Sequence, residues 1–170
     1  MKYVRILLAV LALAFLALQF FRPPRNLSHP SPPGGIESRY PVPDHVMQIF
    51  RRSCYDCHSD STAYPWYAEI QPVGWWLNSH IEHGKRQVDF DRFAEYRPFR
   101  QFGKFRDIIE QLQKDDMPLP SYLFIHRYAR LSPDEKEDVI RWSRAMMDTM
   151  HARYPADSLQ KRRPEGRGPG

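Results

Sequence analysis

The only two cysteines of the chain stand two residues apart, and a histidine directly follows the second, in the stretch SCYDCHSD (53–60). Two thiols at this spacing can add to the two vinyl groups of one haem, which places the next residue against the iron. In this interpretation Cys54 and Cys57 hold the haem through thioether bonds, and the imidazole of His58 is the proximal iron ligand. The expected cofactor is therefore haem c.

Two other chemistries stay open for the same cysteines. Cys54, Cys57, His80 and His83 follow a C-x₂-C-x₂₂-H-x₂-H pattern, although structural zinc sites usually separate their histidines by three to five residues. A CxxC pair in an exported protein can also oxidise to a disulfide or take part in redox exchange. A thioredoxin-like redox protein would need alternating strands and helices, and the sequence predicts no convincing strand.

The sixth iron ligand has several candidates. Met117 lies in DDMPLP, outside any apolar stripe, and the proline after it stiffens the loop that would carry the sulfur to the iron. A thioether is a soft axial ligand that raises the reduction potential. His80 is the alternative and would give bis-histidine iron at a lower potential. His126 and His83 are weaker candidates, and an open sixth position is also possible.

The walls of the haem pocket are expected to be aromatic. Trp75 and Trp76 are adjacent on a predicted helix, so they cannot both face the same way. We therefore expect one of the two to contact the cofactor.

The first 21 residues, MKYVRILLAVLALAFLALQFF, decide the expected compartment. Lys2 and Arg5 precede an apolar run from Ile6 to Phe21 that only Gln19 interrupts. The pattern predicts a membrane-spanning anchor or a signal segment, and in both cases the rest of the chain is exported. The run ends without a small-x-small cleavage site, which favours an anchor that is kept. We expect the inner membrane to hold the anchor and the periplasm to contain the domain.

Composition divides the chain into four parts. Residues 1–22 are the anchor or signal segment, and residues 23–42, rich in proline, are expected to form a linker. The folded domain is predicted to cover residues 43–154. Residues 155–170 form a basic tail that is expected to be disordered because its end has no apolar side chain to bury.

The domain is predicted to be all-helical. Apolar spacing predicts helices over 45–53, capped by Asp44, over 72–84, stopped by Gly84, and over 104–116. The last helix begins at Ser132, where a proline and Glu135 complete a capping box. Its apolar stripe contains Val139, Trp142, Met146 and Met150.

The order of these features resembles class I c-type cytochromes over residues 44–147. More narrowly, the stretches CYDCHSDSTAYPWY, QPVGWWLNSHIEHGK, DMPLPSY and RLSPDEKEDVIRW are similar to a family of exported haem-binding domain proteins. This resemblance implies a small cytochrome c-like helical domain around a covalent haem. Residues 60–100, aromatic-rich and containing NSHIEH, depart from the simple cytochrome plan.

The expected function is single-electron transfer at the outer face of the cytoplasmic membrane, without catalysis of a substrate reaction. The net charge is +5, and seven basic residues lie between positions 85 and 106. They are Lys85, Arg86, Arg92, Arg97, Arg100, Lys104 and Arg106. This stretch is expected to clamp the haem propionates or to attract an acidic redox partner. Export excludes a nucleic-acid partner. The alternative is a haem sensor or a small peroxidase-like protein with an open sixth position.

Overall fold

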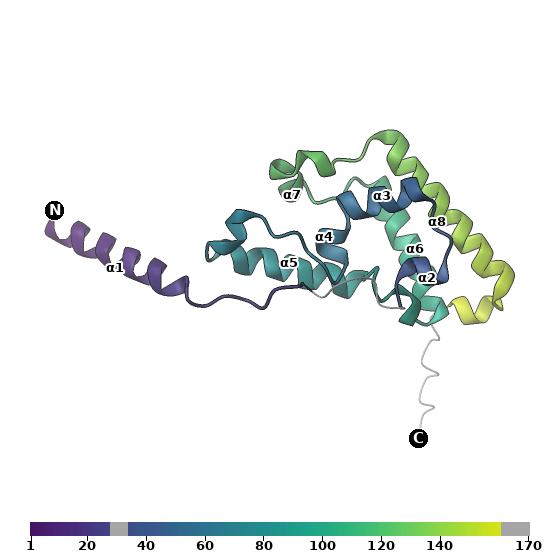
Figure 1. The fold of residues 1–170 in the computed structure, drawn as a ribbon, viewed down its shortest axis with the longest axis horizontal. Coiled ribbons are helices and arrows are strands. Elements are labelled where there is room, and N and C mark those ends of the chain that lie inside the picture. The colour runs from purple at the N-terminus through teal and green to yellow at the C-terminus, as the bar shows by residue number, and fades with distance from the viewer. Residues whose placement is uncertain (28–33, 161–170) are drawn as a thin grey trace, which may run out of the picture. The chain divides into compact units, whose positions relative to one another are not determined.

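The computed structural model describes residues 1–27 and 34–160, and these are helical apart from turns and loops (Figure 1). Within them, the one β interaction is an isolated antiparallel bridge between Leu27 and Ser61. The all-α prediction is therefore confirmed. The chain forms two compact units, Met1–Pro30 with Tyr55–Asp89, and Ser31–Cys54 with Phe90–Gly170.

The first unit contains three α-helices and one 3₁₀ turn. They are α1 (Lys2–Leu18), α4 (Tyr55–His58), η1 (Trp66–Glu69) and α5 (Val73–Gln87). The α1 helix forms where the apolar run predicts one, and none of its side chains is buried. In the described part of the chain, however, no helix has both the length and the apolar character needed to cross a membrane. The predicted spanning anchor is thus not supported.

The second unit contains the remaining elements. They are α2 (Ile36–Arg39), α3 (Asp44–Ser53), η2 (Phe93–Glu95), α6 (Pro98–Gln113), α7 (Pro120–Ile125), η3 (Arg127–Ala129), α8 (Pro133–Arg153) and η4 (Ala156–Leu159). Helices α6 and α8 pack side by side (Figure 1). The predicted stripe of α8 is buried: Val139, Trp142, Met146 and Met150.

An aromatic cluster forms the core of the second unit. Phe105 is fully buried, and its ring centroid lies 5.0 Å from those of Tyr40 and Phe93 and 5.5 Å from that of Trp142. Phe50 of α3 contacts the Trp142 ring edge-on at 5.5 Å. Burial of rings this large supplies much of the driving force for folding this unit.

The helix ends confirm one sequence prediction and correct two. Ser132 caps α8, and Glu135 completes the capping box as predicted. Asp44 does not cap α3: it is the first helical residue, and Pro43 holds the cap position without a side-chain bond. Gly84 does not stop α5, which continues to Gln87. The close packing of Gly84 against a neighbouring segment explains why glycine stands inside this helix.

Parts of the expected linker and tail belong to the folded units. Within 23–42, Ile36 is fully buried and Tyr40 nearly so. In the tail, Ala156–Leu159 form η4, and Leu159 is buried where η4 packs near α6. The prediction of disorder is corrected for these residues because Leu159 is apolar and finds a core to enter. The rest of the predicted tail, 161–170, and residues 28–33 of the linker lie outside the described residues.

Candidate haem-attachment site

The two cysteines lie at the end of one helix and inside the next. Cys54 is the C-cap of α3, and its backbone N–H donates to the carbonyl of Phe50 at 2.8 Å. Cys57 and His58 are the last residues of the short helix α4. Both cysteines are half-buried. The boundary between the two units falls within the motif, between Cys54 and Tyr55.

The Cys57 thiol is held in its neutral form. Burial, with a smaller contribution from the Asp56 carboxylate, raises the pKa of Cys57 to about 11. Reactive and catalytic cysteines have the opposite property, a lowered pKa in a positive environment. The environment of Cys57 therefore does not support the hypothesis that the CxxC pair takes part in redox exchange.

The backbone of α5 lies directly against Cys57 through Gly84. A Cβ atom added to Gly84 would stand 2.6 Å from the Cys57 carbonyl oxygen and 3.3 Å from the Cys57 Cβ. Because contacts this short to backbone atoms do not occur, only glycine permits the two helices to approach so closely. This approach positions α4 along the last two turns of α5.

The same helix end orients His58. The Nδ1 atom of His58 lies 3.0 Å from the carbonyl oxygen of Val88, the C-cap residue of α5. A carbonyl only accepts, so Nδ1 carries the proton of this bond, and in the neutral imidazole the lone pair is then on Nε2. Metal-binding histidines show this arrangement, in which a bond to the second nitrogen fixes the tautomer and the ring direction. The residues present thus fit a proximal iron ligand.

A network of polar side chains fixes the segment after the motif. Ser59 is fully buried, and its hydroxyl donates to the Tyr55 carbonyl at 2.8 Å. The Thr62 hydroxyl donates to the Asp56 carbonyl at 2.7 Å. The side-chain amide of Asn26 donates to the Ser59 carbonyl and to the Thr62 hydroxyl, at 2.8 and 2.9 Å. The sequence does not single out Asn26, since it lies in a stretch with linker composition.

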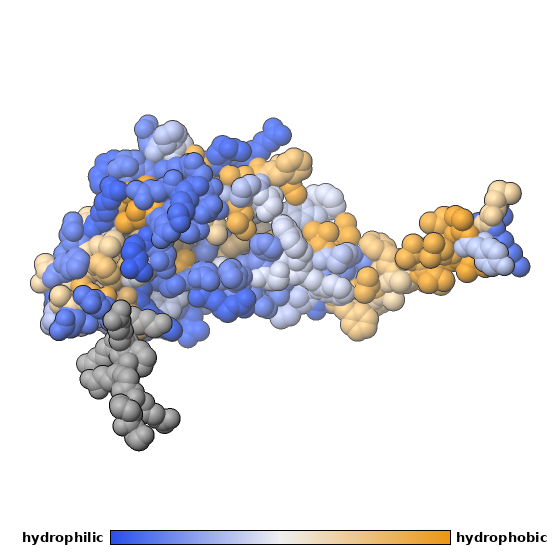
Figure 2. All heavy atoms as spheres, turned by 180° about the vertical axis from the view of Figure 1, so that it is seen from behind, coloured by the Kyte–Doolittle hydropathy of each residue, from blue (hydrophilic) through white to orange (hydrophobic). Residues whose placement is uncertain are grey.

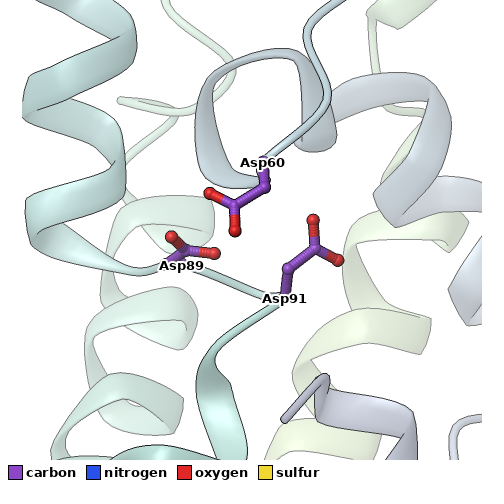
Figure 3. A group of neighbouring side chains, drawn as sticks. All are labelled: Asp60, Asp89 and Asp91. Atoms are coloured by element: carbon purple, nitrogen blue, oxygen red, sulfur yellow. The ribbon is translucent and has the colours of Figure 1, made fainter. Parts of the chain in front are cut away.

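An acidic pair beside the motif holds a lysine. Figure 3 shows Asp60, on the loop that follows α4, and Asp89, just beyond α5, with their carboxylates close together. Lys85 pairs with Asp60, and its Nζ lies 3.9 Å from the Asp89 carboxylate and 2.9 Å from the Asn26 side-chain oxygen. The pair is thus part of the scaffold around α4. Asp91, also drawn, belongs to the second unit.

The zinc alternative is not supported. Cys57, His80 and His83 all lie in the first unit, yet among the described residues they do not bring their ligand atoms together as a metal ion would require. His83 is exposed on the surface of α5.

The predicted sixth ligands lie in both units. Met117 is half-buried in the second unit, between α6 and α7. His80 belongs to the same unit as His58, and its Nδ1 lies 2.9 Å from the Trp76 carbonyl oxygen. His126 stacks on Tyr122 with ring centroids 4.3 Å apart. Met117 and His80 both stay predictions.

The two tryptophans of α5 face different neighbours, as expected for adjacent helical residues. The Trp75 indole N–H donates to the Phe21 carbonyl at 2.7 Å. Trp76 instead lies against the His80 ring, with centroids 4.3 Å apart. Both are substantially exposed. A haem contact by one of them stays a prediction, and Trp76 is the one that accompanies a candidate ligand.

Most of the basic stretch is neutralised locally. Lys85 is held by the acidic pair, and four others pair with acidic neighbours: Arg86 with Glu82, Arg92 with Glu95, and Lys104 and Arg106 with Asp107. Arg97 and Arg100, at the start of α6, have no ion pair among the described residues and are exposed.

The described residues form two all-helical units, and the hydrogen bond of His58 suits a metal-binding histidine. A family model for the haem-binding domain matches residues 13–145, and the chain belongs to this family. No curated protein and no solved structure gives a significant match.

Proposed function

We propose that the chain carries one haem c, attached through Cys54 and Cys57, and transfers single electrons. Membership of the haem-binding domain family supports the cofactor. The covalent form is supported by the CxxCH spacing, and the hydrogen bond from His58 Nδ1 to the Val88 carbonyl is the observation that carries the proposal. Bound haem would supply a one-electron couple between ferric and ferrous iron.

The chain's own residues set the properties of that couple. The Val88 carbonyl keeps the proton on Nδ1 of His58, so that Nε2 is the ligand atom, and increases the basicity of Nε2. The Gly84 approach fixes Cys57 and His58 against α5, so the ligand nitrogen is held by backbone atoms. Rigid placement of this kind lowers the reorganisation that accompanies electron transfer.

The sixth ligand in the proposal is Met117, with His80 as the alternative. Methionine at this position raises the reduction potential, whereas histidine lowers it. We expect Met117→Ala to let ferrous protein bind carbon monoxide promptly, and Met117→His to lower the potential. If His80→Ala opens the iron and Met117→Ala does not, His80 is the ligand.

The proposed role is carrier rather than catalyst. If the parent protein already binds carbon monoxide promptly, the sixth position is open, and a sensor or peroxidase-like role replaces electron transfer. For a carrier, Arg97 and Arg100 are candidates to attract an acidic redox partner, because they are exposed and no described acidic side chain pairs with them.

Export is part of the proposal, with the domain outside the cytoplasmic membrane. Its support is the order of Lys2 and Arg5 before an apolar helix that has no buried side chain. Fractionation of cells, with N-terminal sequencing of the mature protein, tests the location and whether the segment is kept.

Acid–acetone extraction tests the covalent attachment. Haem should stay with the parent polypeptide and with the neighbouring control Ser53→Ala. The double variant Cys54→Ala/Cys57→Ala should release all of its haem. Haem that stays with the double variant after extraction would refute the thioether bonds.

A further inference from the structure

The first unit exposes a group of large apolar side chains beyond the end of α1. Trp66 is 76% and Phe20 is 88% exposed, and Phe21, Ile70 and Trp75 are also exposed. Figure 2 shows hydrophobic residues along the N-terminal helix and around its base. We call these five residues the aromatic surface. Contiguous exposed apolar area of this kind marks an interaction site in a folded protein.

The aromatic surface is tied to the end of α1 by hydrogen bonds. The Gln19 side-chain amide donates to the Gln71 carbonyl at 3.1 Å, and its oxygen accepts from the Gln71 backbone N–H at 2.9 Å. The Trp75 indole donates to the Phe21 carbonyl. These bonds hold Gln71 and the start of α5 beside residues 19–21, which directly follow α1.

The charge around this surface is positive. Arg22, Arg25 and Glu69 lie beside it, and residues 61–76 contain no other charged side chain, so the local net charge is +1. Glu69 pairs with Arg22 and Arg25, both of which stay about half-exposed. The net positive charge complements an anionic phospholipid headgroup layer.

We propose that the aromatic surface binds the interfacial layer of an anionic phospholipid bilayer. Tryptophan is enriched at the level of the headgroups because its ring is apolar and its N–H is polar. Arginines beside the rings contact the phosphates, and the exposed apolar side chains of α1 provide the deeper contact. The result is a fixed orientation of the first unit toward the lipid. This inference does not depend on the haem.

Flotation of the full-length holoprotein with lipid vesicles tests the proposal. The triple variant Trp66→Ser/Ile70→Ser/Trp75→Ser keeps α1 and all basic residues. Its control is Phe124→Ser/Ile125→Ser/Tyr128→Ser, which removes three large side chains of the second unit that are at least as exposed. At equal haem content, we expect the triple variant to bind phosphatidylglycerol vesicles at least about tenfold more weakly than the parent. The control should match the parent.

The second measurement compares binding of the parent protein to anionic and to zwitterionic vesicles. The parent should bind phosphatidylglycerol vesicles several-fold more tightly than phosphatidylcholine vesicles, and salt should reduce the difference. Unchanged binding by the triple variant would overturn the proposal, because α1 alone would then explain the affinity. An equal loss in the control, or equal binding to both lipids, would overturn it as well.

Discussion

The two units differ in what holds them together. The second unit has a core of fully buried rings, including Phe50, Phe93 and Phe105. In the first unit only Leu77, Ile81 and Val88 are buried large apolar side chains among the described residues. Its other buried side chains are polar: Ser59, Thr62, Gln71 and Asp89. The first unit thus has few apolar contacts of its own, and its polar interior positions the segment that contains Cys57 and His58.

Loss of the cofactor should affect the two units very differently. In the Cys54→Ala/Cys57→Ala variant, we expect amide hydrogen exchange in α4 and α5 to accelerate at least about tenfold, since few apolar contacts hold this unit. Exchange in α6 and α8 should stay unchanged. The measurement is exchange followed by mass spectrometry on parent and variant. Equal protection of the α5 amides from exchange in the parent and the variant would contradict the claim that the first unit depends on haem more than the second unit does.

The core of the second unit should be sensitive to a single truncation. Phe105→Ala removes a fully buried ring that contacts Tyr40, Phe93 and Trp142, and should lower the free energy of unfolding by about 3–5 kcal/mol. Denaturant unfolding followed by near-ultraviolet circular dichroism measures the loss. A change below about 1 kcal/mol would mean that this cluster is not the core.

Two glycine-to-alanine variants, one in each unit, test how closely the glycines are packed. Gly84→Ala should destabilise the first unit by about 1–3 kcal/mol and shift the haem potential, because the new Cβ meets the Cys57 carbonyl. Gly103 of α6 is the matched control, since nothing lies within 4 Å of its added Cβ. Gly103→Ala should stabilise α6 by up to about 1 kcal/mol. Equal changes of both variants in denaturant unfolding and in redox titration would contradict the claim that Gly84 is needed for the close contact with Cys57.

Alkaline pH should weaken the second unit through Tyr40. Burial raises the pKa of Tyr40 to about 12, and its hydroxyl donates to Gln101. The unfolded chain loses this proton near pH 10 while the folded chain keeps it, so the free energy of unfolding falls between about pH 10 and 12. Below pH 10 the contribution is complete. Tyr40→Phe should flatten this part of the curve, and an unaltered slope would argue against the buried phenol.

The helices could be read from the sequence where local signals and packing agree. The capping box at Ser132 and the stripe of α8 are such cases. At Gly84 the signals conflict: a glycine after an apolar stretch predicts a helix end, but its partner, the Cys57 backbone, is 27 residues away in the chain. The contact between Gly84 and the Cys57 backbone therefore cannot be predicted from the residues around Gly84.

The candidate site likewise contains residues that the sequence predicts and supporting contacts that only the structure shows. The motif Cys54–His58 was evident because its chemistry lies in five consecutive residues. Its supports, Asn26 and the Val88 carbonyl, come from distant segments, and one of them is a backbone atom that carries no sequence signal. The sixth ligand cannot be chosen from types and spacing alone, since methionine and histidine both fit.

Intact-mass spectrometry of protein matured in a host that attaches haem c tests the central claim most directly. The account predicts a polypeptide heavier by one haem under denaturing conditions, with the added mass on the peptide that contains Cys54 and Cys57. A mass equal to that of the unmodified polypeptide would contradict it.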